Sequence, residues 1–280
     1  MENIKLNNGV EMPLVGFGTY QVAEAKECAA AVVNATKAGY RLIDTAQAYG
    51  NEEYVGEGIR QSGIPRQELF ITTKVWFNSY EPEDCRKSIE ESLKKLGTDY
   101  LDLVLLHWPF GNTYAAWRVL EEFYLAGTFR AIGVSNYAPS QLIDLIHFNK
   151  VVPAVNQIET NLVCQQRELR EWMAKYKIAH QAYAPLGQGR ANEMFEGEKI
   201  RGIAKAHGKT TRQIALRFLI QDGVAVIPKS VHAERMQENL AILDFSLTDD
   251  EMESLRSMDE NRPLIGSAQA PALVEFAMTW

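Results

Sequence analysis

Short apolar runs alternate along most of this chain with longer segments whose apolar residues recur every three or four positions. The short runs predict buried strands, because a strand of a covered parallel sheet is apolar on both faces. The longer segments have the period of an amphipathic helix. The first such unit has an expected strand at Val15–Thr19 and an expected helix at Ala25–Ala38, which Gly39 ends.

The same unit recurs as far as residue 240. Further strands are expected at Leu42–Ile43, Leu69–Lys74, Leu101–Leu106, Phe129–Val134, Ala154–Ile158, Ile178–Ala184 and Val224–Ile227. Further helices are expected at Asn51–Gln61, from Pro82 to Gly97, and at Tyr114–Ala126, Pro139–Asn149, Gln165–Tyr176, Glu198–Ala206, Thr210–Gln221 and, last, Ala233–Leu240. About eight alternating units predict an α/β fold of the closed (β/α)8 TIM-barrel type.

An open doubly wound sheet is the alternative fold, but it usually has fewer units and carries a glycine-rich phosphate loop. Here Gly16-x-Gly18 lacks a third glycine and opens no helix. The segments Ile4–Leu6 and Glu11–Pro13 flank the turn residues of a β-hairpin, which we expect to act as a lid or plug. The tail Pro263–Trp280 is expected to lie over the active-site face. No linker divides the chain, so residues 1–280 are predicted to form a single domain.

Composition narrows the class of partner. A chain of 280 residues with a net charge of −7 and a pI near 5.4 is unsuited to nucleic acid or an anionic membrane, so a small molecule is expected instead. The three cysteines are far apart, which predicts no disulfide framework, no metal site and a reducing cytoplasmic location. The N-terminus lacks the apolar core of a signal peptide, and no apolar run reaches the ~18 residues of a membrane helix. We therefore expect neither secretion nor a membrane segment.

Polar residues end most of the expected strands. They are Asp44, Lys74, His107, Ser135-Asn136, Gln157, Tyr183 and Lys229. Any one of them could be an ordinary satisfied polar residue, but the active site of a TIM barrel lies at this end of the strands. Their recurrence therefore predicts a shared site.

The first of these residues suggest acid–base chemistry. Asp44 and Lys74 end neighbouring strands and are expected to form a salt bridge. Taken alone, Asp44 could merely cap the next helix. Tyr49 follows Asp44 closely, and an ammonium beside it would lower the pKa of its phenol and make it a general acid. A neutral His107 could then hold the substrate oxygen.

The remaining residues suggest a seat for a dinucleotide. Amide and hydroxyl groups at Ser135, Asn136 and Gln157 match a carboxamide, and the Tyr183 ring can stack on nicotinamide. After the eighth strand, Ile227–His232 leads into a helix that carries Arg235 and Asn239. Two cations near a helix start favour the 2′-phosphate of NADP over an ordinary solvated helix terminus.

Six motifs together resemble the aldo-keto reductase superfamily over nearly the whole chain. The longest is Gly-Tyr-Arg-Leu-Ile-Asp-Thr-Ala-x-x-Tyr-x-Asn-Glu at Gly39–Glu52. The others, in family order, are Ile71–Trp76, Leu105–Pro109, Ala131–Asn136, Asn156–Glu159 and Ile227–Val231. The resemblance implies a TIM barrel that binds NADPH without a Rossmann domain and reduces carbonyls by hydride transfer.

The resemblance also implies residue roles. Tyr49 is the implied proton donor, with Lys74 and Asp44 tuning it and His107 orienting the carbonyl. The implied cofactor residues are Thr19, Asp44, Ser135, Asn136, Gln157, Tyr183, Pro185, Leu186, Lys229, Ser230, Val231, His232, Arg235 and Asn239, with Arg235 favouring NADPH. Tyr20, Trp76, His107 and Trp108 are expected to contact the substrate.

Departures from the family concern the substrate side. Tyr20 stands where many members have tryptophan, Thr160-Asn161 replaces His-Pro, and the connection from Trp108 to Trp117 is short. This short loop is similar to that of the microbial branch of the family, which includes 2,5-diketogluconate and methylglyoxal reductases. We expect an NADPH-dependent reductase of aldehydes, dicarbonyls or keto-sugars, acting as a monomer or weak homo-oligomer. An NADPH-binding regulatory subunit is the alternative, whereas a metal-dependent hydrolase would need a ligand cluster that the strand ends lack.

Overall fold

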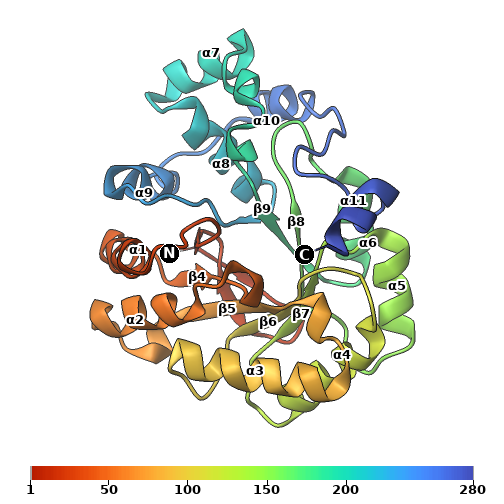
Figure 1. Ribbon diagram of the computed structural model, residues 1–280. Helices are drawn as coiled ribbons and strands as arrows, with labels where there is room; N and C mark the ends of the chain where they lie inside the picture. Colours follow the sequence, from red (N-terminus) through yellow and green to blue (C-terminus); the bar gives the residue numbers. More distant parts are fainter. Residues whose placement is uncertain (1, 280) are drawn as a thin grey trace.

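Eight parallel strands form a barrel inside a ring of helices in the computed structural model, which describes residues 2–279 (Figure 1). In sheet order the strands are β3 (Gly16–Gly18), β4 (Leu42–Asp44), β5 (Phe70–Val75), β6 (Leu103–Leu106), β7 (Ile132–Ser135), β8 (Val155–Glu159), β9 (Ala179–Tyr183) and β10 (Ala225–Val226). A parallel bridge between Val15 and Val226 brings the first and last strands together, and the Val226 amide donates to the Leu14 carbonyl at 2.8 Å. The predicted (β/α)8 TIM barrel is confirmed.

The helices up to residue 240 are α1 (Ala25–Ala38), α2 (Glu52–Ser62), α3 (Pro82–Leu96), α4 (Thr113–Leu125), α5 (Pro139–His147), α6 (Arg167–Lys175), α7 (Glu198–His207), α8 (Thr211–Gln221) and α9 (Ala233–Leu240). One of them follows each barrel strand, except that two, α7 and α8, follow β9. Gly39 ends α1 with φ 114°, and Gly97 ends α3 with φ 67°. These left-handed C-caps are the glycine stops that the sequence predicted.

Two more helices follow, so the expectation that Ala233–Leu240 is the last helix was wrong. They are α10 (Asp249–Arg256) and α11 (Pro271–Ala277). Thr248 and Glu251 form a reciprocal capping box at the start of α10. This Thr-x-x-Glu pattern is visible in the sequence and predicts the start of a helix. Because α10 follows α9 with no strand between them, it falls outside the strand–helix alternation.

The N-terminal hairpin closes the bottom of the barrel. Its strands β1 (Asn3–Lys5) and β2 (Glu11–Pro13) pair antiparallel. Leu6 and Met12 are buried in the cluster of apolar side chains that fills this end of the barrel interior. The hairpin is therefore the expected plug.

Two glycines allow the first and last strands to approach each other. A Cβ on Gly16 would lie 2.9 Å from the Ile227 side chain and 2.3 Å from that of Leu42 in β4, and one on Gly18 would lie 2.9 Å from the Ile227 carbonyl oxygen. The Gly16-x-Gly18 pair thus permits barrel closure rather than forming a phosphate loop.

The C-terminal segment is attached to the upper end of β8. The Glu159 carboxylate accepts hydrogen bonds from the amides of Leu264 and Ile265 at 2.6 and 2.9 Å. Ile265, Leu273 and Phe276 then line the cavity at the strand ends, as the prediction for the tail required. Residue 280, the end of that predicted tail, lies outside the described residues. Within residues 2–279, no helix has both the length and the apolar character needed to cross a membrane.

Candidate active site

A cavity of about 1030 Å³ opens at the C-terminal ends of the strands. Most of the predicted site residues line it: Tyr20, Asp44, Tyr49, Trp76, His107, Trp108, Ser135, Asn136, Gln157, Tyr183, Pro185, Leu186, Lys229, Ser230, Arg235 and Asn239. Thr19, Val231 and His232 lie outside this lining, and Thr19 instead donates its amide and hydroxyl to the Asp44 carbonyl. The barrel thus gathers residues from distant parts of the chain.

Lys74 lies beneath the cavity, fully buried, between the first two predicted catalytic residues. Its Nζ donates to Asp44 Oδ1 at 2.6 Å, to the Thr45 carbonyl at 2.8 Å and to the Tyr49 hydroxyl at 3.2 Å. The register of β4 and β5 explains this, because Asp44 faces Thr72 and Lys74 stands two residues further up β5. All three ammonium protons are used, so Lys74 holds the carboxylate and the phenol together.

Burial governs the protonation of this trio. It raises the pKa of Asp44 and lowers that of Lys74, and the contact between the two opposes both shifts. Burial and the nearby Asp44 carboxylate raise the pKa of the Tyr49 phenol well above 10. The expectation of a lowered phenol pKa was therefore wrong, because desolvation of the phenolate outweighs the ammonium. Tyr49 retains its proton until a stronger base, such as an alkoxide, forms beside it.

His107 lies at the end of β6 and faces Tyr49. Its ring centroid is 5.7 Å from that of Tyr49 and 5.1 Å from that of Trp76, both edge-on. Burial, reinforced by the Lys74 charge, lowers the pKa of His107 well below 6.5. The imidazole is therefore neutral at physiological pH and can donate one N–H to an oxygen in the cavity.

Acid should destabilise the fold through its buried histidines. Burial and the charge of Arg170 lower the pKa of His180 to about 3. Since the unfolded chain takes up a proton near pH 6.5, the contribution of His180 is fully present above that pH and is lost below it, by up to about 1.4 kcal/mol per pH unit. Urea unfolding between about pH 7.5 and about pH 5.5 should show a shallower loss for His180→Gln than for the wild type. Parallel losses would contradict a neutral His180.

The predicted nicotinamide seat is already hydrogen-bonded. Tyr183 Oη donates to Asn136 Oδ1 at 2.8 Å, and Asn136 Nδ2 donates to the His107 carbonyl at 3.0 Å. Ser135 Oγ donates to the Gln157 carbonyl at 2.7 Å. The side chains that would meet a carboxamide are thus held in place by one another and by the main-chain carbonyls of His107 and Gln157.

Exposed cations line part of the cavity. Lys229 and Arg235 lie there as predicted, together with Arg212, whose guanidinium is 5.0 Å from the centre of the Phe195 ring. Arg212 was not predicted, and neither were the loop residues Gln188, Gly189, Arg190 and Asn192, nor Gln21, Ala48, Ala184 and Glu238. The glycines and arginine that follow Pro185-Leu186 could have indicated the loop, because small residues and a cation often flank bound phosphates.

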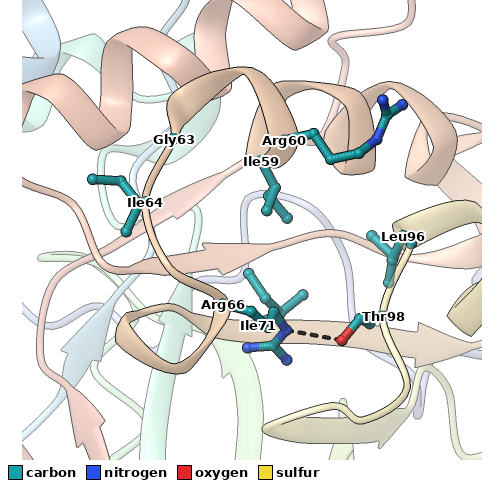
Figure 2. Close-up of a pocket in the computed structure, with 9 residues that line it drawn as sticks. Ile59, Arg60, Gly63, Ile64, Arg66, Ile71, Leu96 and Thr98 are labelled. Atoms are coloured by element: carbon teal, nitrogen blue, oxygen red, sulfur yellow. Dashed lines mark hydrogen bonds between the residues drawn. The ribbon is translucent and has the colours of Figure 1, made fainter.

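A smaller cavity of about 260 Å³ lies between the ends of α2 and α3, around Ile59, Ile64 and Leu96 (Figure 2). Arg66 is its main polar residue. Its Nε donates to Thr98 Oγ1 at 3.0 Å, and its two terminal nitrogens donate to the Leu69 and Tyr100 carbonyls at 2.9 and 3.0 Å. It also pairs with the buried Asp102 at 2.8 Å. These contacts make Arg66 a structural cation. In residues 2–279, no cluster of His, Cys, Asp or Glu is arranged to hold a metal.

Most of the chain is similar to known oxidoreductases. The aldo/keto reductase family model matches residues 14–260. A "9,11-endoperoxide prostaglandin H2 reductase" from Trypanosoma cruzi is 41% identical, with 94% of this chain and 93% of that protein covered. The "glyoxal reductase" of Bacillus subtilis is 42% identical, with 93% and 94% covered.

A solved structure of an aldo-keto reductase has the same fold. The Bombyx mori aldo-keto reductase in complex with NADP superposes with a TM-score of 0.90 at 33% identity and covers 95% of each chain. The barrel, the Asp44–Lys74–Tyr49 trio and these similarities lead to one conclusion: the chain belongs to the aldo/keto reductase family.

Proposed function

We propose that the protein reduces aldehydes and activated ketones with NADPH, and that Tyr49 donates the proton. The observation that carries this proposal is the Tyr49 hydroxyl itself, which accepts a hydrogen bond from the buried Lys74 and faces a cavity wide enough for a dinucleotide and a small carbonyl compound. The NADP complex of the Bombyx mori relative supports the cofactor, and the Bacillus subtilis glyoxal reductase supports a dicarbonyl substrate.

The protein's part in the reaction is to position the carbonyl and supply one proton. NADPH, when bound, supplies the hydride. Gln157, Asn136 and Tyr183 would hold its nicotinamide. The neutral His107 and the Tyr49 hydroxyl both face the same space, so they can bind one carbonyl oxygen between them. Tyr49 then transfers its proton to the alkoxide, and the Lys74 ammonium stabilises the phenolate that remains.

An assay of cofactor oxidation tests this function. With NADPH present, glyoxal, methylglyoxal, a simple aldehyde and a keto-sugar should each be tried as substrate. We expect turnover that is highest for dicarbonyls and insensitive to chelators. NADPH binding without turnover of any of these compounds would instead support the regulatory subunit, and absence of NADPH binding would contradict both functions.

Arg235 should set the preference for NADPH over NADH. A hydrogen bond between a guanidinium and a phosphate contributes about 1.5–3 kcal/mol, so Arg235→Ala should weaken NADPH binding about tenfold to a hundredfold. NADH affinity should hardly change, because NADH has no 2′-phosphate. Lys87→Ala, which removes an exposed cation on α3, is the matched control. Equal losses for NADPH and NADH would show that Arg235 does not contact the 2′-phosphate.

A further inference from the structure

The barrel interior contains a glutamine that none of the chemistry above uses. Gln181 lies in β9, is completely buried, and belongs to the polar layer directly below the cavity. Its Oε1 accepts a hydrogen bond from Gln157 Nε2 at 2.8 Å, whereas its own Nε2 reaches only Met12 Sδ at 3.8 Å. A thioether is a weak acceptor, so packing alone would favour an apolar side chain here.

The position of Gln181 fixes what Gln157 can offer to a ligand. Gln157 Nε2 also donates to Asp44 Oδ2 at 2.7 Å. An amide nitrogen has two protons, and these two acceptors use both. An ionised carboxylate only accepts, so Asp44 determines which end of the Gln157 amide points toward it. Among residues 2–279, Gln157 Oε1 has no hydrogen-bond partner, and Gln157 lines the cavity.

We propose that Gln181 is a positioning residue that makes Gln157 a pure acceptor and so selects a cofactor ring carrying an N–H donor. Without Gln181, the second N–H of Gln157 would be unsatisfied in a buried site or would turn toward the cavity. The amide would then present a donor as well as an acceptor to the ring. This inference rests on the proposed use of NADPH, since the ring in question is its nicotinamide.

One hydrogen-bonded chain crosses the barrel. It runs from Tyr49 through Lys74, Asp44 and Gln157 to Gln181, with donor–acceptor distances of 3.2, 2.6, 2.7 and 2.8 Å. Asp44 is its branch point, because one carboxylate oxygen holds the lysine and the other holds the glutamine. The same carboxylate therefore positions both the proton donor and the cofactor seat.

The test compares binding of NADPH with that of its 3-acetylpyridine analogue, in which a methyl group replaces the carboxamide NH2. Dissociation constants are measured by quenching of tryptophan fluorescence, which requires no turnover. The wild type should bind NADPH about threefold to tenfold more tightly than the analogue, as expected for one hydrogen bond. In Gln181→Met this ratio should fall toward one.

His180→Gln is the matched control, because its side chain projects from the opposite face of the same strand and contacts Thr160. It should keep the wild-type ratio. Gln181→Leu is measured in parallel, so that the ratio can still be determined if Gln181→Met does not fold. An unchanged ratio in a folded Gln181 variant, or a wild-type ratio of one, would overturn the inference while leaving the proposed function intact. Absence of NADPH binding by the wild type would overturn the proposed function as well.

Discussion

Replacement of Tyr49 by phenylalanine is expected to reduce the rate of carbonyl reduction about 10²–10⁴-fold, the range usual for loss of a general acid. The ring remains, so its edge contact with His107 and its 5.0 Å packing against Tyr20 are preserved. The hydroxyl contacts Lys74, and Tyr49 is not among the residues proposed to hold the cofactor. NADPH affinity should therefore stay within about threefold of the wild-type value, which fluorescence titration can measure.

The control for this variant is Tyr54→Phe, which removes a phenol from α2 outside the cavity. It should retain wild-type turnover. If Tyr49→Phe also retained wild-type turnover, the proton would have to come from another group. A loss of NADPH binding that matches the loss of rate would show that the hydroxyl serves the cofactor rather than the carbonyl.

Replacement of Lys74 by methionine should have the largest effect on stability. Lys74 is fully buried and donates to Asp44, Thr45 and Tyr49, so its loss leaves the Asp44 carboxylate without a cation. Breaking one side of a buried ion pair costs about 3–5 kcal/mol. Urea unfolding at neutral pH should show a loss of this size, and turnover should fall with it because the Tyr49 phenolate is no longer stabilised.

A second substitution separates the two effects. Asp44→Asn in the Lys74→Met background removes the unpaired charge, and the amide that replaces it can still pair with Gln157. The double variant should recover part of the lost stability and none of the lost turnover. A double variant that is no more stable than Lys74→Met would mean that the carboxylate is already neutral in the single variant.

Much of the barrel could be predicted because its signals are local. Each strand is a short apolar run, each helix has its own period, and Gly39 and Gly97 mark helix ends. The polar strand ends could be predicted for the same reason, since barrel topology places all of them at one rim. The ion pair between Asp44 and Lys74 likewise follows from the strand positions of the two residues.

Features that depend on packing could not be predicted in the same way. The direction of the Tyr49 pKa shift depends on how completely the phenol is desolvated, which no motif encodes. Gln181 occupies an ordinary position within a strand, and its role emerges only when β8 and β9 bring it to Gln157. The contact between Glu159 and the segment at Leu264 spans more than a hundred residues, and neither end shows a pattern that points to the other.

Direct transfer of hydrogen from cofactor to substrate tests the proposed function most directly. Wild-type protein would be incubated with NADPH that carries deuterium at the reactive position of the nicotinamide and with methylglyoxal as the carbonyl compound. We expect direct transfer: one NADPH is consumed for each alcohol formed, and the deuterium appears on the new carbinol carbon. Alcohol without deuterium, or NADPH consumption without alcohol, would contradict it.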